Sequence, residues 1–256
     1  MFRVVVYCTL AISLLAGRLF GQERIIHSPS GVEVIFVLED NMFPESWRKS
    51  PINAEARPIA PAEVARTIRV VEQALDKYPA EMLKRHLGKV YVCEYLAFYG
   101  QTFGGTNSRT NVYLSNGGVK KGYTDHCIEQ LFHAEFSSIL LRNHPQFWDE
   151  KGWLMAKDPQ TAYGKGSGVE AIRDGVSSTT FSPEWHKRGF LYQYANSSIE
   201  NDFNSFAKQI FCPEAKFWQV VEAYPYLAQK NTLAIAFYQK IHPQFTHTYF
   251  KAFEKK

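Results

Sequence analysis

The strongest constraint on the fold of this chain is an apolar stripe that follows Pro61. Its members recur at intervals of three and four residues, and they are Val64, Ile68, Val71, Leu75 and Tyr78. Residues at this spacing share one face of an α-helix, and that face must be buried against another layer of the protein. Pro79 ends the pattern, and residues 80–87 predict a second, shorter helix that stops at Gly88.

Three segments have the composition of β-strands. Residues 31–40 alternate apolar and polar side chains, residues 89–98 are rich in valine, tyrosine and phenylalanine, and residues 110–114 follow a turn around Gly104 and Gly105. We expect the last two segments to pair as a hairpin. The sequence therefore predicts a small antiparallel sheet ahead of a central helix at residues 125–143.

Helical patterns continue towards the C-terminus over residues 196–211, 213–229 and 231–241. Residues 157–183 are rich in glycine and serine and predict a long surface loop. No segment has the composition of a linker between two domains. We therefore predict one α+β domain over residues 22–256, mostly helical, with its small sheet before the central helix.

The first 21 residues have the pattern of a signal peptide. Arg3 gives a basic start, Val4 to Ala16 form an apolar run, and residues 17–21 supply small side chains for cleavage. The apolar run is short for a bilayer span, although a membrane anchor is the alternative. Charges interrupt every later apolar run, so we expect a secreted or periplasmic protein without a membrane span after cleavage.

Charge and cysteine content narrow the class of partner. The formal net charge of +4 falls to +2 when Arg3 and Arg18 leave with the signal peptide. A net charge so close to zero argues against nucleic acid as a partner. Cys93, Cys127 and Cys212 remain, which allows at most one disulfide and leaves its pairing open. The absence of a CxxC pair argues against a cysteine-based zinc site.

The predicted central helix places one carboxylate among apolar side chains. On a helical wheel Glu135 lies beside Ile128 and Ile139. A buried carboxylate must be paired, hydrogen-bonded or bound to a metal ion, so Glu135 is a candidate functional residue. The alternative is a glutamate at the edge of the core with an arginine or backbone amides as partners. His126 and His133 share another face of this helix, which we expect to be exposed to solvent.

The stretch from Phe132 to Leu140 resembles the His-Glu-Phe helix of the zinc-binding metallopeptidases, which are gluzincin-type exported bacterial proteins. Similar segments follow in the order typical of that family, at residues 95–100, 104–106, 112–114, 189–195 and 200–204. The resemblance covers roughly residues 35–250. It implies a zincin-like fold, zinc as the cofactor, and a peptide or protein as the substrate or partner.

This sequence departs from the family at the residues that bind the metal. In an HExxH helix two histidines lie one turn apart, and the glutamate activates the metal-bound water. If Glu135 is that glutamate, Ala134 and Ser138 occupy the histidine positions. His133 is a weak alternative ligand because it lies about 100° around the helix from residue 134. A serine hydroxyl is a poor zinc ligand, so we expect zinc binding to be weak or absent.

The same resemblance assigns the third metal ligand to an acidic residue on a later helix, where Glu200 is the candidate. We place Glu200 on the apolar side of that helix with Phe203, and Asp202 on one flank. The alternative role for Glu200 is to complement the helix dipole in the first turn. Tyr194 is a candidate electrophilic group beside the site, or else a structural tyrosine.

Two functions therefore stand side by side. The first is a secreted zinc metallopeptidase-like enzyme with Glu135 as general base. The second is a non-catalytic module on the same fold that binds a peptide, a glycan or a partner protein. Loss of the metal histidines favours the second, since a catalytic zinc site normally has three protein ligands. Both predict one pocket between the two helices, lined by Ala134, Glu135, Ser138 and Glu200.

Overall fold

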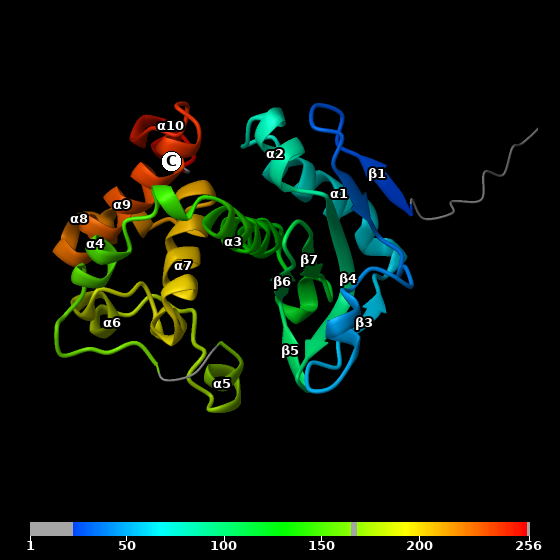
Figure 1. The fold of residues 1–256 in the computed structure, drawn as a ribbon, viewed down its shortest axis with the longest axis horizontal. Helices are drawn as coiled ribbons and strands as arrows, with labels where there is room; N and C mark the ends of the chain where they lie inside the picture. The colour runs from blue at the N-terminus through cyan, green and yellow to red at the C-terminus, as the bar shows by residue number, and fades with distance from the viewer. Residues whose placement is uncertain (1–22, 165–167, 255–256) are drawn as a thin grey trace, which may run out of the picture.

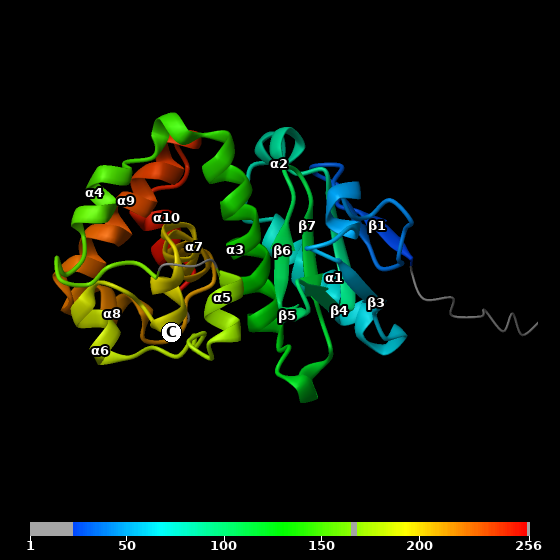
Figure 2. The same cartoon turned by 60° about the horizontal axis from the view of Figure 1, so that its bottom comes forward.

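The computed structural model describes residues 23–164 and 168–254, so the predicted signal peptide lies outside the described residues. A sheet with α1 (Pro61–Leu75) and α2 (Ala80–His86) lies on one side of the long helix α3 (Asp125–Asn143), and the C-terminal helices lie on the other (Figures 1 and 2). Helices make up about half of the structure, which agrees with the predicted mostly helical α+β class. No helix within the described ranges has the length and apolar content needed to cross a membrane.

The strands lie in the N-terminal half of the chain. They are β1 (Arg24–Ile26), β2 (Glu33–Ile35), β3 (Glu55–Pro58), β4 (Lys89–Phe98), β5 (Gln101–Phe103), β6 (Gly105–Asn107) and β7 (Val112–Ser115). The helices after α3 are α4 (Glu150–Met155), α5 (Gly168–Arg173), α6 (Pro183–Arg188), α7 (Ile199–Phe211), α8 (Phe217–Ala223), α9 (Pro225–Ile241) and α10 (His247–Lys251). Short 3-10 turns are η1 (Glu45–Arg48), η2 (Val119–Lys121), η3 (Pro145–Phe147) and η4 (Gln193–Ser197).

β4 organises the sheet. Its first half pairs in parallel with β2 and β7, and its second half pairs antiparallel with β3 and β5. The predicted small antiparallel sheet is therefore wrong, because the sheet is mixed and has seven strands. β5 and β6 explain why β7 runs parallel to β4. Together they form one return strand, of which β5 pairs antiparallel with β4 and β6 pairs antiparallel with β7. The chain therefore reverses direction twice between β4 and β7.

α3 begins and ends at the residues predicted from the sequence. The Thr124 hydroxyl caps its N-terminus by accepting a hydrogen bond from the amide of Cys127 at 3.2 Å, and Pro145 follows its C-terminus. The helix contacts α1 and the sheet on one side and α7 on the other. Because both sides are covered, the prediction of a solvent-exposed histidine face is wrong: His133 is fully buried and His126 is half-buried.

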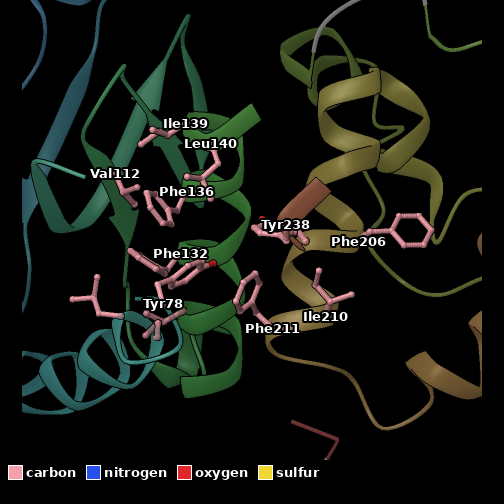
Figure 3. Close-up of a cluster of buried hydrophobic side chains, with 14 of the residues drawn as sticks. Tyr78, Val112, Phe132, Phe136, Ile139, Leu140, Phe206, Ile210, Phe211 and Tyr238 are labelled. Atoms are coloured by element: carbon pink, nitrogen blue, oxygen red, sulfur yellow. The ribbon is translucent and has the colours of Figure 1, made fainter. Parts of the chain in front are cut away.

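Aromatic side chains fill the core on both sides of α3. Phe132 and Phe136 lie on the side of the sheet, near Val112, whereas Phe211 of α7 and Tyr238 of α9 approach from the opposite side (Figure 3). Each of these side chains is buried, and burial of one large apolar side chain contributes roughly 1.5–3 kcal/mol. The core therefore holds α3 from both directions.

A buried ion pair joins two of the C-terminal helices. Oδ2 of Asp202 on α7 lies 2.6 Å from Nζ of Lys230 on α9, and neither side chain is exposed. Trp153 Nε1 and Tyr163 Oη donate hydrogen bonds to the same oxygen at 2.8 and 2.6 Å. Lys230 also donates to the carbonyl of Gly189 at 2.6 Å. The flank of α7 on which Asp202 was placed is covered by α9, so Asp202 is fully buried.

The three cysteines of the described chain, Cys93, Cys127 and Cys212, form no disulfide with one another. Cys93 lies inside β4, where burial raises the pKa of its thiol to about 12. Cys212 is also buried, and its Sγ lies 3.2 Å from Nδ1 of His126. None of the three disulfides that the sequence left open forms in this structure.

We predict that Asp202→Ala lowers the free energy of unfolding by about 3–5 kcal/mol, because it leaves the Lys230 ammonium buried without a counter-charge. Urea denaturation followed by circular dichroism measures this change. The double variant Asp202→Leu with Lys230→Met removes both charges and should recover at least half of the loss. A cost below about 1 kcal/mol for Asp202→Ala would contradict the role given to the pair.

Candidate functional site

A cleft lies between the return strand formed by β5 and β6, the outer face of α3, and the segment from η4 to α7. It consists of two adjoining hollows of about 380 and 340 Å³. Glu135 and Tyr194 line both hollows, Ala134 lines the first, and Ser138 and Glu200 line the second. All the candidate residues except His133 therefore meet in one cleft, although Ala134 and Glu200 lie in its two different parts.

Glu135 occupies the middle of the cleft, against the edge strand. Its Oε2 accepts a hydrogen bond from the side-chain amide of Asn107 at 2.6 Å. Gly105 permits this approach, because a Cβ atom at Gly105 would lie 3.0 Å from both Cγ and Oε1 of Glu135. A side chain at Gly105 would therefore crowd Glu135 and force it to shift, although the backbone angle of Gly105 is ordinary.

The surroundings of Glu135 change its acidity. Burial raises the pKa of the Glu135 carboxyl to about 7, and the negative charge of Glu200 acts in the same direction. The hydrogen bond from Asn107 and the positive charge of Arg142 oppose that rise. Glu135 thus changes between its neutral and ionised forms near neutral pH, which is the environment expected of a carboxyl group at a functional site.

Glu200 differs from its prediction. Its side chain is 47% exposed, and Oε1 pairs with the guanidinium of Arg142 at 3.2 Å. The prediction that Glu200 lies on the apolar side of α7 is wrong, because Glu200 lies with Asn204 on the strip of this helix that lines the cleft, whereas Phe203 is buried. The carboxylate that the family resemblance assigns to a metal is here paired with a cation of the protein itself.

Ser138 and Ala134 do not offer a metal the ligands it needs. Ala134 has no donor atom, and Ser138 Oγ accepts a hydrogen bond from Asn204 Nδ2 at 2.8 Å. Oδ1 of Asn204 accepts a second bond from the Ser137 hydroxyl at 2.5 Å. Asn204 of α7 therefore binds both Ser137 and Ser138 of α3. Ser138 occupies the position of the second histidine in an HExxH helix, so this asparagine bonds to the side chain that replaces a metal ligand.

His133 cannot replace the missing ligands because it points away from the cleft. Its Nδ1 lies 2.9 Å from the Tyr78 hydroxyl, and its ring stacks on Phe211 with centroids 4.9 Å apart. Nε2 faces the Glu129 carboxylate at 3.6 Å, and Lys77 pairs with that carboxylate. Burial lowers the pKa of His133 to about 4, despite the opposing effect of Glu129, so the ring is neutral at pH 7.

The residues that could hold zinc therefore do not fit a catalytic zinc site. Such a site needs three protein ligands and one open position. Within residues 23–164 and 168–254, no group of three or more histidine, cysteine, aspartate or glutamate side chains is arranged to hold a metal ion. At the expected position the donors reduce to Glu200, which Arg142 already pairs, and one serine hydroxyl.

Tyr194 lies beside Glu135 and completes one side of the cleft. Burial and the nearby Glu135 carboxyl raise the pKa of Tyr194 to about 12, so its hydroxyl stays protonated at neutral pH. Gly168 of α5 lies against this hydroxyl, and a Cβ atom at that position would overlap it. The tyrosine can therefore offer a hydrogen-bond donor to a molecule in the cleft.

Sequence reasoning missed the polar residues that cross-link the cleft. Arg142 pairs with Glu200, donates to the Asn107 side chain, and donates to the carbonyl of Ser108 at 2.8 Å. Asn204 follows Glu200 by one helical turn and so shares its face of α7. That spacing was the available signal for Asn204, whereas nothing local to the sequence placed Asn107 within reach of α3.

The structure belongs to the α+β class, with a mixed sheet, a long helix on its face and a helical C-terminal half. The structure is similar to a solved structure described as a "putative zinc-binding metallo-peptidase" from Bacteroides caccae. The TM-score is 0.54, and the match covers 88% of this chain and 85% of that chain at 14% sequence identity. At this identity the likeness concerns the fold alone.

The sequence itself matches no known protein in these comparisons. No protein-family model matches the chain, and no curated protein matches it.

We predict that Glu135→Gln raises the melting temperature more at pH 8 than at pH 5. The pKa of Glu135 in the fold lies above that of the unfolded chain, so the protonated carboxyl stabilises the fold at low pH. That contribution is lost as the pH rises through about 7, and a neutral glutamine does not lose it. Differential scanning fluorimetry at the two pH values measures the difference.

The control is Glu55→Gln, which changes an exposed glutamate on β3 and should shift the melting temperature little at either pH. Equal effects of Glu135→Gln at pH 5 and pH 8 would show that burial does not control the ionisation of Glu135.

Proposed function

We propose that this protein binds extended peptides in the cleft and does not hydrolyse them with zinc. One observation carries the proposal: hydrogen bonds and an ion pair of the chain itself engage the donors left at the metal position, while the cleft beside them stays open. The cleft is the part of a peptidase-like fold that a binding protein can keep after its metal ligands are replaced.

The backbone of β6 supports a peptide as the occupant. The carbonyl of Gly104 accepts from Ser115, and the amide of Ser108 donates to Asn111, so both face the neighbouring strand. Backbone groups alternate in direction along an antiparallel pair, which directs those of Gly105 and Asn107 away from β7. An extended peptide can pair with such an edge as an added strand.

The polar side chains of the cleft match this use. The protonated Tyr194 hydroxyl can donate a hydrogen bond, and Glu135 can accept or donate one according to its ionisation. Peptide carbonyls and amides need both kinds of partner. A glycan would need the same groups, but it would not use the alternating backbone of the edge strand, so this strand favours the peptide.

We also propose that the protein acts outside the cytoplasm. Residues 1–21 carry the basic start, the apolar run and the small residues of a signal peptide. Peptides and proteins of the cell surface or its surroundings would then be the partners within reach.

We predict that mature protein purified without a histidine tag contains less than one zinc ion per chain, as measured by mass spectrometry of the metal content.

The double variant Ala134→His with Ser138→His places two imidazoles one turn apart beside Glu135. Zinc at about 100 times its dissociation constant should then stabilise the variant by about 2.7 kcal/mol. Ala134→His alone is the matched control and should gain much less. Stoichiometric zinc in the native protein that is lost in Glu200→Gln would overturn the proposal.

We predict that the protein binds to an array of immobilised seven-residue peptides, which are composed of serine, threonine and valine and have one varied central residue. Replacing single amides of a bound peptide by esters removes one hydrogen-bond donor at a time. Esters at alternate positions should weaken binding by about tenfold, and those between them much less, because only every second residue faces β6. Cleavage of the peptides, no binding, or equal effects at every position would each contradict this function.

A further inference from the structure

A third hollow opens beside the cleft at the end of the sheet. Its volume is about 200 Å³, and its walls include Trp47, Ile52, Phe98, Phe103 and Thr106; we call it the aromatic pocket. It is smaller than a typical site for a whole small molecule, which has a volume of about 300–1,000 Å³, and its size suits a single side chain.

The walls of the aromatic pocket are fixed by contacts with one another. The rings of Trp47 and Phe98 meet edge to face with centroids 5.5 Å apart, and Phe98 meets Phe103 in the same way at 5.6 Å. The backbone secures the same walls: Ala54 donates to the carbonyl of Trp47 at 2.8 Å, and Tyr99 donates to that of Ile52 at 2.6 Å. A pocket held in this way exists before its ligand arrives and loses little entropy on binding.

The aromatic pocket is continuous with the cleft. Phe103 and Thr106 line both the pocket and the part of the cleft that contains Glu135. Both residues belong to the return strand, on which Gly105 touches Glu135. Successive residues of a strand lie about 3.3 Å apart, so the pocket opens within one or two peptide residues of Glu135.

The pocket and the cleft differ in charge. No charged side chain lines the pocket among the described residues, whereas Glu135, Glu200 and Lys208 line the cleft. Burying a charged or strongly polar group against these rings would leave it without a partner, which is costly. An apolar or aromatic side chain would gain from both burial and ring contacts.

We propose that the aromatic pocket binds one large apolar side chain, such as phenylalanine, tryptophan or leucine, of the peptide that lies along β6. This inference rests on the proposed peptide-binding function and adds its selectivity. The backbone of β6 holds a peptide of any sequence, and the aromatic pocket chooses those with a bulky apolar residue at one position.

The test uses the full mature chain and the peptide array with one varied central residue. Peptides with phenylalanine, tryptophan or leucine at that position should bind about 10- to 100-fold tighter than those with alanine, aspartate or lysine. Trp47→Ala should remove this preference and leave the binding of the alanine peptides within about threefold, because their backbone contacts do not involve the pocket.

Two further variants keep the test decisive. Trp185→Ala is the matched control, since it removes a half-buried tryptophan from α6, outside the three hollows, and should leave the preference intact. Ile52→Trp fills the pocket without removing a ring, and should abolish the preference even if Trp47→Ala is too unstable to study. Circular dichroism establishes that each variant is folded.

The outcomes separate the two proposals. Binding of all peptides without preference for an apolar residue would overturn the selectivity and leave the peptide-binding function standing. A preference that survives in a folded Trp47→Ala or Ile52→Trp variant would also overturn the assignment to this pocket. No binding of any peptide would overturn both.

Discussion

The structure depends on the burial of α3 from two opposite sides. Phe132 and Phe136 anchor the helix to the sheet, and Phe211 and Tyr238 anchor the C-terminal helices to the helix. One helix therefore belongs to both halves of the core, on the side of the sheet and on the side of the C-terminal helices. The cleft forms along α3 between the sheet and the C-terminal helices, where Ala134, Glu135 and Ser138 are among the residues that line its two hollows.

The sequence predicts the local elements well and their long-range relations poorly. The bounds of α3 and β4 agree with their predictions, because a capping threonine and a following proline mark the helix, and a dense run of apolar residues marks the strand. The parallel pairing of β4 with β7 could not be predicted, since it depends on the short strands β5 and β6, which have little pattern of their own. The helical wheel placed His133 in solvent because a wheel assumes one buried face, and α3 has two.

The candidate site shows the same contrast between local features, which the sequence predicts, and long-range contacts, which it does not. Glu135 was identified from a carboxylate in an apolar arc, and the structure places it in the cleft with a raised pKa. Glu200 was placed with Phe203 on the wheel but lies with Asn204 in the cleft, and its partner Arg142, 58 residues away in the sequence, could not be predicted. Asn107 and Asn204 were missed for the same reason: each has a role only because the fold brings another element next to it.

The contacts of Arg142 have a consequence for how the cleft responds to its surroundings. The guanidinium reaches the edge strand through Asn107 and the opposite helix through Glu200, so it connects both sides of the opening. Both partners of the ion pair are more than 40% exposed, and mobile ions screen such a pair. A metal ion bound by imidazoles would hold the two sides through coordinate bonds that dissolved salt scarcely affects. Dissolved salt therefore weakens the contact between Arg142 and Glu200, but hardly affects the hydrogen bonds by which Asn204 joins the same two helices.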